Sequence, residues 1–378
     1  MGSHVRGVKL RGLGRVSGPI VPALKGCAVL AALLLALASP AAADGATVAA
    51  AGGSVRLVRD GKVRYDAIGS GFRLESFDLI RTNAGSSVEI DLDPRAGIDV
   101  TVLVDADTAL MFGLSSSGGD QPGAIELIAG AVEVTSRGPS GSSEFRILTS
   151  SATIAVRETS FAVTTASDGA ILVAARTGIV EVTLPDGRTL DARPGMAVEV
   201  DRLAGLFRSV RIADERYRAF RGEWLDRRNS ALVSDASSAL QGWQQEYRTA
   251  RDAFEKAYSV LMEHRALIDE WVEAAWRGVR LGDVTALERG NMSTEWDDVS
   301  DALNPARIAA FRFETAVASL ERLSPYVDRV AVEIAELYRG IANDRQVMEA
   351  RLATVRHALK LHAEQHHSRS HEHEETVR

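Results

Sequence analysis

The sequence predicts an α+β protein in separate domains, an N-terminal all-β domain followed by a C-terminal antiparallel α-helical bundle with long coiled-coil-like helices. Two patterns predict this. Hydrophobic residues alternate at period two from about residue 47 to 201, and they recur every seven residues after about residue 212. With 378 residues, 46% of them hydrophobic and 25% charged, the chain can form two globular cores.

The β half is predicted from short segments separated by polar turns. In SVRLVRDGKVRY, Val55 and Leu57 alternate with charged residues, and the Asp-Gly pair that follows is typical of a hairpin turn. GIVEVTLPDGRTL repeats the pattern around Pro-Asp-Gly. The region contains no segment of helical period, so we expect an all-β domain over residues 44–205, of β-solenoid or sandwich-like form.

The helical half is predicted from heptad spacing, which places apolar groups on one face of a long helix. Ser324 and Pro325 are expected to open the last helix, and Asn304 and Pro305 a shorter one. Two helices of about 40 residues, each about 60 Å long, would lie antiparallel. The heptad sets are Leu240, Tyr247, Phe254, Leu261 and Ile268, and Val327, Ile334, Ile341, Met348 and Val355. We expect the bundle over residues 206–368 and a polar tail rich in His and Glu over 369–378.

The first 43 residues have the features of a secretory signal peptide. They contain five basic residues, no acidic residue and an apolar run at 28–38, and the small residues Ala41 and Ala43 precede a cleavage site before Asp44. The run is short for a membrane span, and retention as an uncleaved anchor is the alternative. We expect cleavage, a periplasmic or extracytoplasmic location and no transmembrane span in the mature protein.

Composition argues against several classes of function. Cys27 is the only cysteine, and no histidine lies between His4 and His264, so the β half has neither a Ser-His pair nor a His-ligated metal. The chain also lacks a phosphate-binding loop of the Walker type. The excess of 51 acidic over 44 basic residues argues against nucleic acid as a partner. We expect no enzyme activity and no cofactor.

Two groups in the helical half each leave two interpretations open. His362 and His366 are four residues apart, so on a helix both imidazoles would face one side and could share a divalent metal ion. The alternative is a solvated tail without a function. All five tryptophans lie in this half, where they either fill the core or, at Trp271 and Trp276, line a groove for a partner.

Several ordered motifs of the β half resemble the FecR domain, an extracytoplasmic all-β module. Arg157, Glu158, Thr159 and Phe161 would form its tight turn between two strands, although the family normally has glycine where this chain has Glu158. The resemblance covers roughly residues 50 to 201. Its other matching positions are Asp78, Ile80, Thr82, Gly130, Val132, Gly178, Val180 and Gly195.

The best-known FecR proteins carry signals from an outer-membrane iron transporter to a sigma factor, through a cytoplasmic segment that precedes a membrane span. At most 27 residues precede the apolar run here, so we do not expect that role. The resemblance and the composition together predict a non-enzymatic cell-envelope protein that acts in protein–protein interaction or scaffolding. A protein partner in the envelope and a homo-oligomer formed through the long helices are expected. The alternative is an envelope sensor that binds a glycan, peptidoglycan or a divalent metal.

Overall fold

The computed structural model describes residues 46–376 with gaps at 60–61, 66–67, 76, 93–98, 114–123, 137–144, 213–215, 277–285 and 329–330. Within its helices and strands, the side chains of 156–158, 274–276, 286–297 and 362–376 lie outside the described set, as do a few single positions. The predicted signal peptide therefore lies outside the described residues. No helix in the described part is long and apolar enough to cross a membrane.

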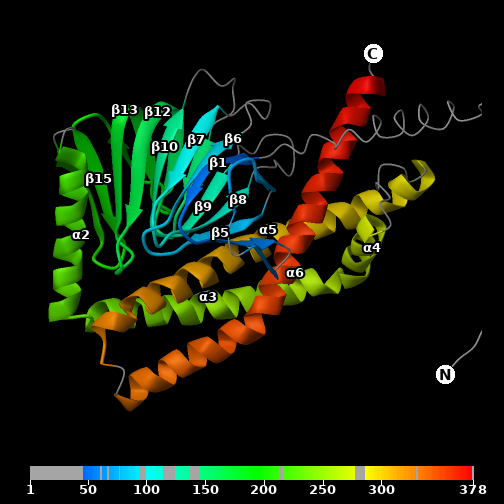
Figure 1. Cartoon of the computed structure of the whole chain (residues 1–378). Helices are drawn as coiled ribbons and strands as arrows, with labels where there is room; N and C mark the ends of the chain where they lie inside the picture. Colours follow the sequence, from blue (N-terminus) through cyan, green and yellow to red (C-terminus); the bar gives the residue numbers. More distant parts are fainter. Residues whose placement is uncertain are drawn as a thin grey trace, which may run out of the picture. The chain divides into compact units, whose positions relative to one another are not determined.

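The N-terminal half of the described chain forms one curled sheet of 16 strands (Figure 1). Its strands are β1 (Ala46–Gly52), β2 (Val55–Arg59), β3 (Lys62–Tyr65), β4 (Arg73–Leu74), β5 (Leu79–Thr82), β6 (Ser87–Leu92), β7 (Val100–Val104), β8 (Ala109–Gly113), β9 (Ala124–Ala129), β10 (Ala131–Ser136), β11 (Phe145–Leu148), β12 (Thr153–Thr165), β13 (Ile171–Thr183), β14 (Thr189–Ala192), β15 (Met196–Asp201) and β16 (Leu206–Arg211).

The main path of the sheet runs β3-β2-β5-β8-β9-β11-β12-β10-β7-β6-β1-β4, and β13 leads from β12 to β14, β15 and β16. The pairs are antiparallel except β9 with β11. β2 pairs with β3 as the Asp-Gly hairpin predicts. The Pro-Asp-Gly turn is also confirmed, because Gly187 donates its N–H to the Leu184 carbonyl at 2.9 Å between β13 and β14. The sheet ends with β16, beyond the predicted boundary at residue 205.

The predicted helices after residue 212 are confirmed. They are α2 (Tyr217–Ser234), α3 (Ser237–Glu263), α4 (Arg265–Trp276), α5 (Ala286–Leu323), the 3₁₀ turn η4 (Ser324–Tyr326) and α6 (Val332–Thr376). α3 packs on α5, where the ring of Phe254 stacks on that of Phe313 at 6.0 Å between centroids. The antiparallel coiled-coil bundle remains a prediction.

Two predicted helix starts are wrong. Pro305 lies inside α5, which runs unbroken from 286 to 323, although proline lacks the N–H for an intrahelical bond. Burial explains the continuity, since Leu303 and Ala306 on either side of this proline are both buried. Ser324 and Pro325 form η4 instead of opening the last helix, which begins at Val332.

Alternating residues give the sheet two buried faces. On β8, Leu110 and Phe112 join a cluster within the curled sheet, whereas Ala109 and Met111 join a cluster that the helices α3, α4, α5 and α6 complete. A third, smaller cluster packs α2 on the sheet around Trp224. The sheet and the helices therefore share hydrophobic core, and the division into separate domains at 44–205 and 206–368 remains a prediction.

Candidate functional site

The first FecR-like motif, around Asp78, has a structural role. The Asp78 carboxylate accepts bonds from Arg59 Nε at 2.9 Å and Nη2 at 2.6 Å, and from the Glu75 backbone N–H at 2.8 Å. Its pKa is raised because burial disfavours the charge more than Arg59 stabilises it. Ile80 is buried in the sheet cluster. The motif fixes the turn that leads into β5.

Threonine hydroxyl groups bond the backbone at the ends of β5, β7, β8 and β10. Thr82 Oγ1 donates to the Asp105 carbonyl at 2.6 Å and accepts the Thr108 backbone N–H at 3.0 Å. Thr108 Oγ1 in turn accepts the Ala131 N–H at 3.0 Å. Gly130 has φ 98°, and a Cβ there would lie 2.2 Å from Thr108 Oγ1, which explains the glycine of the second motif. These motif residues hold backbone groups in place.

The predicted tight turn at Arg157, Glu158, Thr159 and Phe161 is wrong. Thr153–Thr165 is a single strand, β12, whose pairing with β13 shifts register between Arg157 and Ser160. The extra residues form a bulge. The side chains of Arg157 and Glu158 lie outside the described residues, whereas Thr159 and Phe161 are both buried.

The bulge contains Glu158, the position where the family normally has glycine. The bulge lies between Arg157 and Ser160, opposite the stretch of β13 that contains Gly178. Gly178, on the opposing strand, has φ 67°, a left-handed conformation that glycine adopts without steric cost.

The other predicted site residues are not brought together. Trp271 is 0% exposed in the cluster of the helices, so its ring lines no surface groove. The side chain of Trp276 lies outside the described residues, as do those of His362 and His366, whose backbone belongs to α6. Among described side chains, no group of three metal-ligating residues occurs. The metal site therefore stays a prediction.

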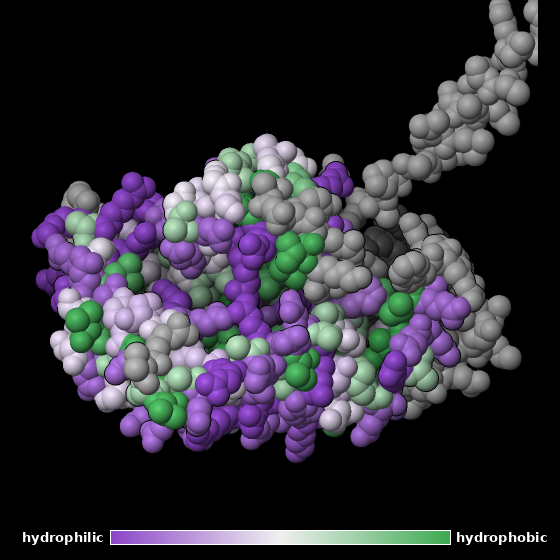
Figure 2. Space-filling view, turned by 60° about the horizontal axis from the view of Figure 1, so that its bottom comes forward, coloured by the Kyte–Doolittle hydropathy of each residue, from purple (hydrophilic) through white to green (hydrophobic). Residues whose placement is uncertain are grey.

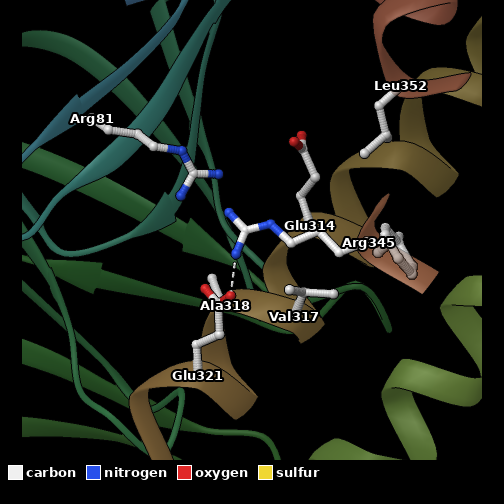
Figure 3. A pocket seen from close by; sticks show the side chains of 8 residues that line it. Arg81, Glu314, Val317, Ala318, Glu321, Arg345 and Leu352 are labelled. Atoms are coloured by element: carbon white, nitrogen blue, oxygen red, sulfur yellow. Dashed lines mark hydrogen bonds and ion pairs between the residues drawn. The ribbon is translucent and has the colours of Figure 1, made fainter. Parts of the chain in front are cut away.

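The candidate site is a charged hollow between β5, α5 and α6, which sequence reasoning missed. Its cavity volume is about 30 Å³, and it opens to solvent. In Figure 3, Arg81 reaches from the strand into the hollow, and Glu314, Glu321 and Arg345 lie across from it on the two helices. The hollow is lined by Arg81, Phe313, Glu314, Val317, Ala318, Glu321, Arg345 and Leu352.

The ion pairs beside this hollow join the sheet and the helices. Glu321 pairs with Arg345, and Glu314 with Arg356, so each pair joins α5 to α6. Outside the lining of the hollow, Glu126 on β9 accepts a bond from Arg307 Nη1 of α5 at 2.7 Å. Salt bridges that are partly or fully buried cost desolvation, so they specify how helices dock more than they add stability.

Glu126 is the most perturbed carboxyl of this interface. Its side chain is 4% exposed, and its Oε2 has no hydrogen-bond partner among the described residues. Burial raises its pKa to about 7, against the opposing attraction of Arg307 and with a further upward contribution from the charge of Glu314. The carboxyl therefore changes charge near neutral pH. An Ile-Glu-Leu-Ile strand gives no sequence signal for this, because such a glutamate resembles one on an exposed face.

Two more arginines fasten helices to the sheet. Arg322, at the end of α5, donates to Thr165 Oγ1 and to the Thr165 carbonyl, both at 2.9 Å. Arg228 of α2 donates to Asp168 at 2.7 Å and also bonds Asp201. These contacts hold α2 and α5 against the sheet at positions away from the hollow.

Residues 78–189 match the family model described as FecR protein, which confirms the predicted resemblance: the chain contains a FecR domain. Two crystal structures of a "putative anti-sigma factor" from Parabacteroides distasonis ATCC 8503, at 1.65 Å and 2.50 Å resolution, are similar to part of the chain. The sequence identities are 21% and 22%, and the TM-scores are 0.32 and 0.33. The match covers 38% of this chain and 63% of the length of each structure. No curated protein matches the chain.

Proposed function

We propose that the chain is a non-enzymatic regulatory protein of the cell envelope that acts by binding another protein through its FecR domain and its helices. The match over residues 78–189 is the observation that carries this proposal. The motif residues Asp78, Thr82 and Gly130 support it, because they hold turns and strands in place and form no catalytic arrangement.

The proposal includes export, with residues 1–43 acting as a cleaved signal peptide and the mature protein in the periplasm or outside the cell. It also includes an antiparallel bundle of the long helices, which would serve as the scaffold and as a surface for self-association. The composition supports export, because the first 43 residues combine basic residues, no acidic residue and an apolar run at 28–38.

The described surface suits a partner that binds reversibly. On the face that Figure 2 shows, hydrophobic residues are scattered among hydrophilic ones and form no single broad patch. The exposed large hydrophobic residues include Ile179 on β13, Val233 on α2 and Val347 on α6, at 51%, 75% and 56% exposure. Interfaces of non-obligate complexes have about the same polarity as the rest of the surface.

Photo-crosslinking in cells tests the proposal. A photoreactive amino acid would be placed at Ile179, Val233 or Val347 in turn, and at the neighbouring buried Met348 as the control. We expect an adduct of one defined mass from at least one exposed position and none from Met348. An adduct with the mass of a second copy would assign the surface to a homo-oligomer. If none of the three exposed positions forms an adduct, a protein-binding role is contradicted.

The charged hollow favours a second candidate function, that of a ligand-binding envelope sensor. The hollow lies where the sheet, α5 and α6 meet, so a bound ligand would contact all three. The ligands expected for such a sensor include glycans, peptidoglycan and divalent metal ions, and the charges of the hollow decide among ligand classes.

A further inference from the structure

Arg81 carries a positive charge that no described residue pairs. Its side chain is half-buried on β5, and it has no hydrogen bond or ion pair among the described residues. Burial lowers its pKa, because the guanidinium has lost much of its water. A buried cation without a partner is costly, so an arginine kept in this position needs an explanation.

The neighbouring strand adds a second arginine. The register of β2 with β5 places Arg56 directly opposite Arg81, so both side chains extend from the same face of the sheet. Like charges directly opposite each other destabilise a strand pair. Arg56 is exposed, so its charge remains solvated.

The carboxylates of the hollow are already engaged. Glu314 pairs with Arg356, and Glu321 pairs with Arg345, in both cases between α5 and α6. Both glutamates attract Arg81 at longer range without bonding it. Because each glutamate is bonded to another arginine, Arg81 has no carboxylate of its own in the hollow.

The remaining walls are apolar or small. Phe313 and Val317 of α5 and Leu352 of α6 line the hollow. In the sheet, the residues level with Arg81 on β8 and β9 are Ala109 and Ala129, which are both buried in the cluster that the helices complete. A ligand that fits these walls has a hydrocarbon part beside its charge.

We propose that this hollow binds a small organic monocarboxylate, with its carboxylate on Arg81 and its apolar part against Phe313, Val317 and Leu352. The guanidinium fork matches a carboxylate with two parallel hydrogen bonds. A dianion such as inorganic phosphate is disfavoured, because the carboxylates of Glu314 and Glu321 also line the space. The inference deepens the sensor alternative and does not depend on the protein-binding role.

Binding at this position would hold α6 against the sheet. Arg345 and Leu352 bring α6 to the hollow, and Arg81 brings the sheet. A ligand that contacts both stabilises the docked arrangement of α6 by mass action, since it binds that arrangement alone. The bound acid would thereby change the affinity of a partner that contacts α6 in its docked position.

Isothermal calorimetry on residues 44–378 tests the proposal with benzoate and hexanoate as probes. We expect saturable binding of at least one acid, none of the matched amides benzamide and hexanamide, and weaker or no binding of inorganic phosphate. Arg81→Met should lower the affinity by about 10- to 100-fold, the loss expected for one charge-assisted bidentate contact. Arg81→Lys should retain part of it, because lysine keeps the charge and loses the fork.

A carboxylate can come from a free acid or from the end of a polypeptide, so N-acetylphenylalanine is the third probe. Tighter binding of the free acids assigns the hollow to a small molecule, and tighter binding of the acetylated amino acid assigns it to a protein C-terminus. Arg211→Met is the matched control, since Arg211 is exposed on β16 away from the hollow.

A stability measurement separates binding from structure. Without ligand, Arg81→Met should melt at or above the temperature of the wild type, because it removes an unpaired charge and keeps the hydrocarbon. A lower melting temperature would show that Arg81 supports the fold, and would overturn the proposal. Equal affinities of wild type and Arg81→Met for every acid, or no saturable binding of any acid by the wild type, would also overturn it.

Discussion

Replacing Glu126 with glutamine removes the carboxyl group that the sheet buries against α5. In the folded protein this group has a pKa of about 7, against 4.5 as its ordinary value. Between these two values the folded state binds more protons than the unfolded state, so the contribution of Glu126 to stability is present below about pH 4.5 and is lost as the pH rises through 7. The charged groups around it are Arg307, Glu314 and Arg356.

The difference between the two pKa values sets the size of the effect. Each unit corresponds to about 1.4 kcal/mol, so the full shift amounts to about 3 kcal/mol. Glu126→Gln should therefore gain about 3 kcal/mol of unfolding free energy relative to the wild type as the pH rises from about 4.5 to above 7. The side-chain oxygen of the glutamine can still accept the Arg307 bond, and any loss that is the same at every pH does not affect the slope.

Urea unfolding followed by circular dichroism, at several pH values between about 5 and 8, gives the required free energies. Glu181→Gln is the matched control, because Glu181 also lies on a strand but is exposed. A difference between wild type and Glu126→Gln that stays constant over this range would refute the reasoning. It would mean that the carboxyl is solvated or fully ionised when the protein is folded.

Three further predictions concern other parts of the chain. Phe161→Ala should lower the unfolding free energy by about 3–5 kcal/mol, because the ring is 1% exposed inside the sheet; urea unfolding measures this, and a loss below about 1 kcal/mol would contradict the burial. A fragment of residues 44–212 should unfold at higher urea than one of residues 44–205, since only the longer one keeps β16 paired with β15; equal midpoints would place the domain boundary at 205. Titration of Zn²⁺ should give weak, non-saturating uptake at the C-terminus, and a one-to-one isotherm abolished by His366→Ala would establish the metal site instead.

Period-two alternation was sufficient to predict the sheet, because β8 and its neighbours bury alternate residues on two faces. The heptad sets likewise marked buried helix faces, as at Tyr247, Phe254 and Leu261. Local sequence patterns gave a wrong helix boundary where the burial of neighbouring residues had the larger effect. Asn304-Pro305 has the form of a helix start, but buried residues on both sides keep α5 continuous through it.

The hollow could not be predicted from the sequence. Arg81 and Glu126 stand in Leu-Ile-Arg-Thr and Ile-Glu-Leu-Ile, where a charged residue between apolar ones indicates an exposed strand face. The helices that cover that face are more than 150 residues away in the chain, and local patterns carry no information about such contacts. The bulge at Thr159 was missed for a similar reason, since it depends on how β12 pairs with β13.

Export is the claim on which the envelope role depends, and the N-terminus and location of the protein in cells test it most directly. Cells that produce the full chain would be separated into cytoplasmic, periplasmic and membrane fractions, and the protein in each would be analysed by mass spectrometry. We predict a mature chain that begins near Asp44, outside the cytoplasm. A membrane-bound chain that retains residues 1–43 would show that the segment is an uncleaved anchor. The intact chain in the cytoplasmic fraction alone would contradict the proposed function.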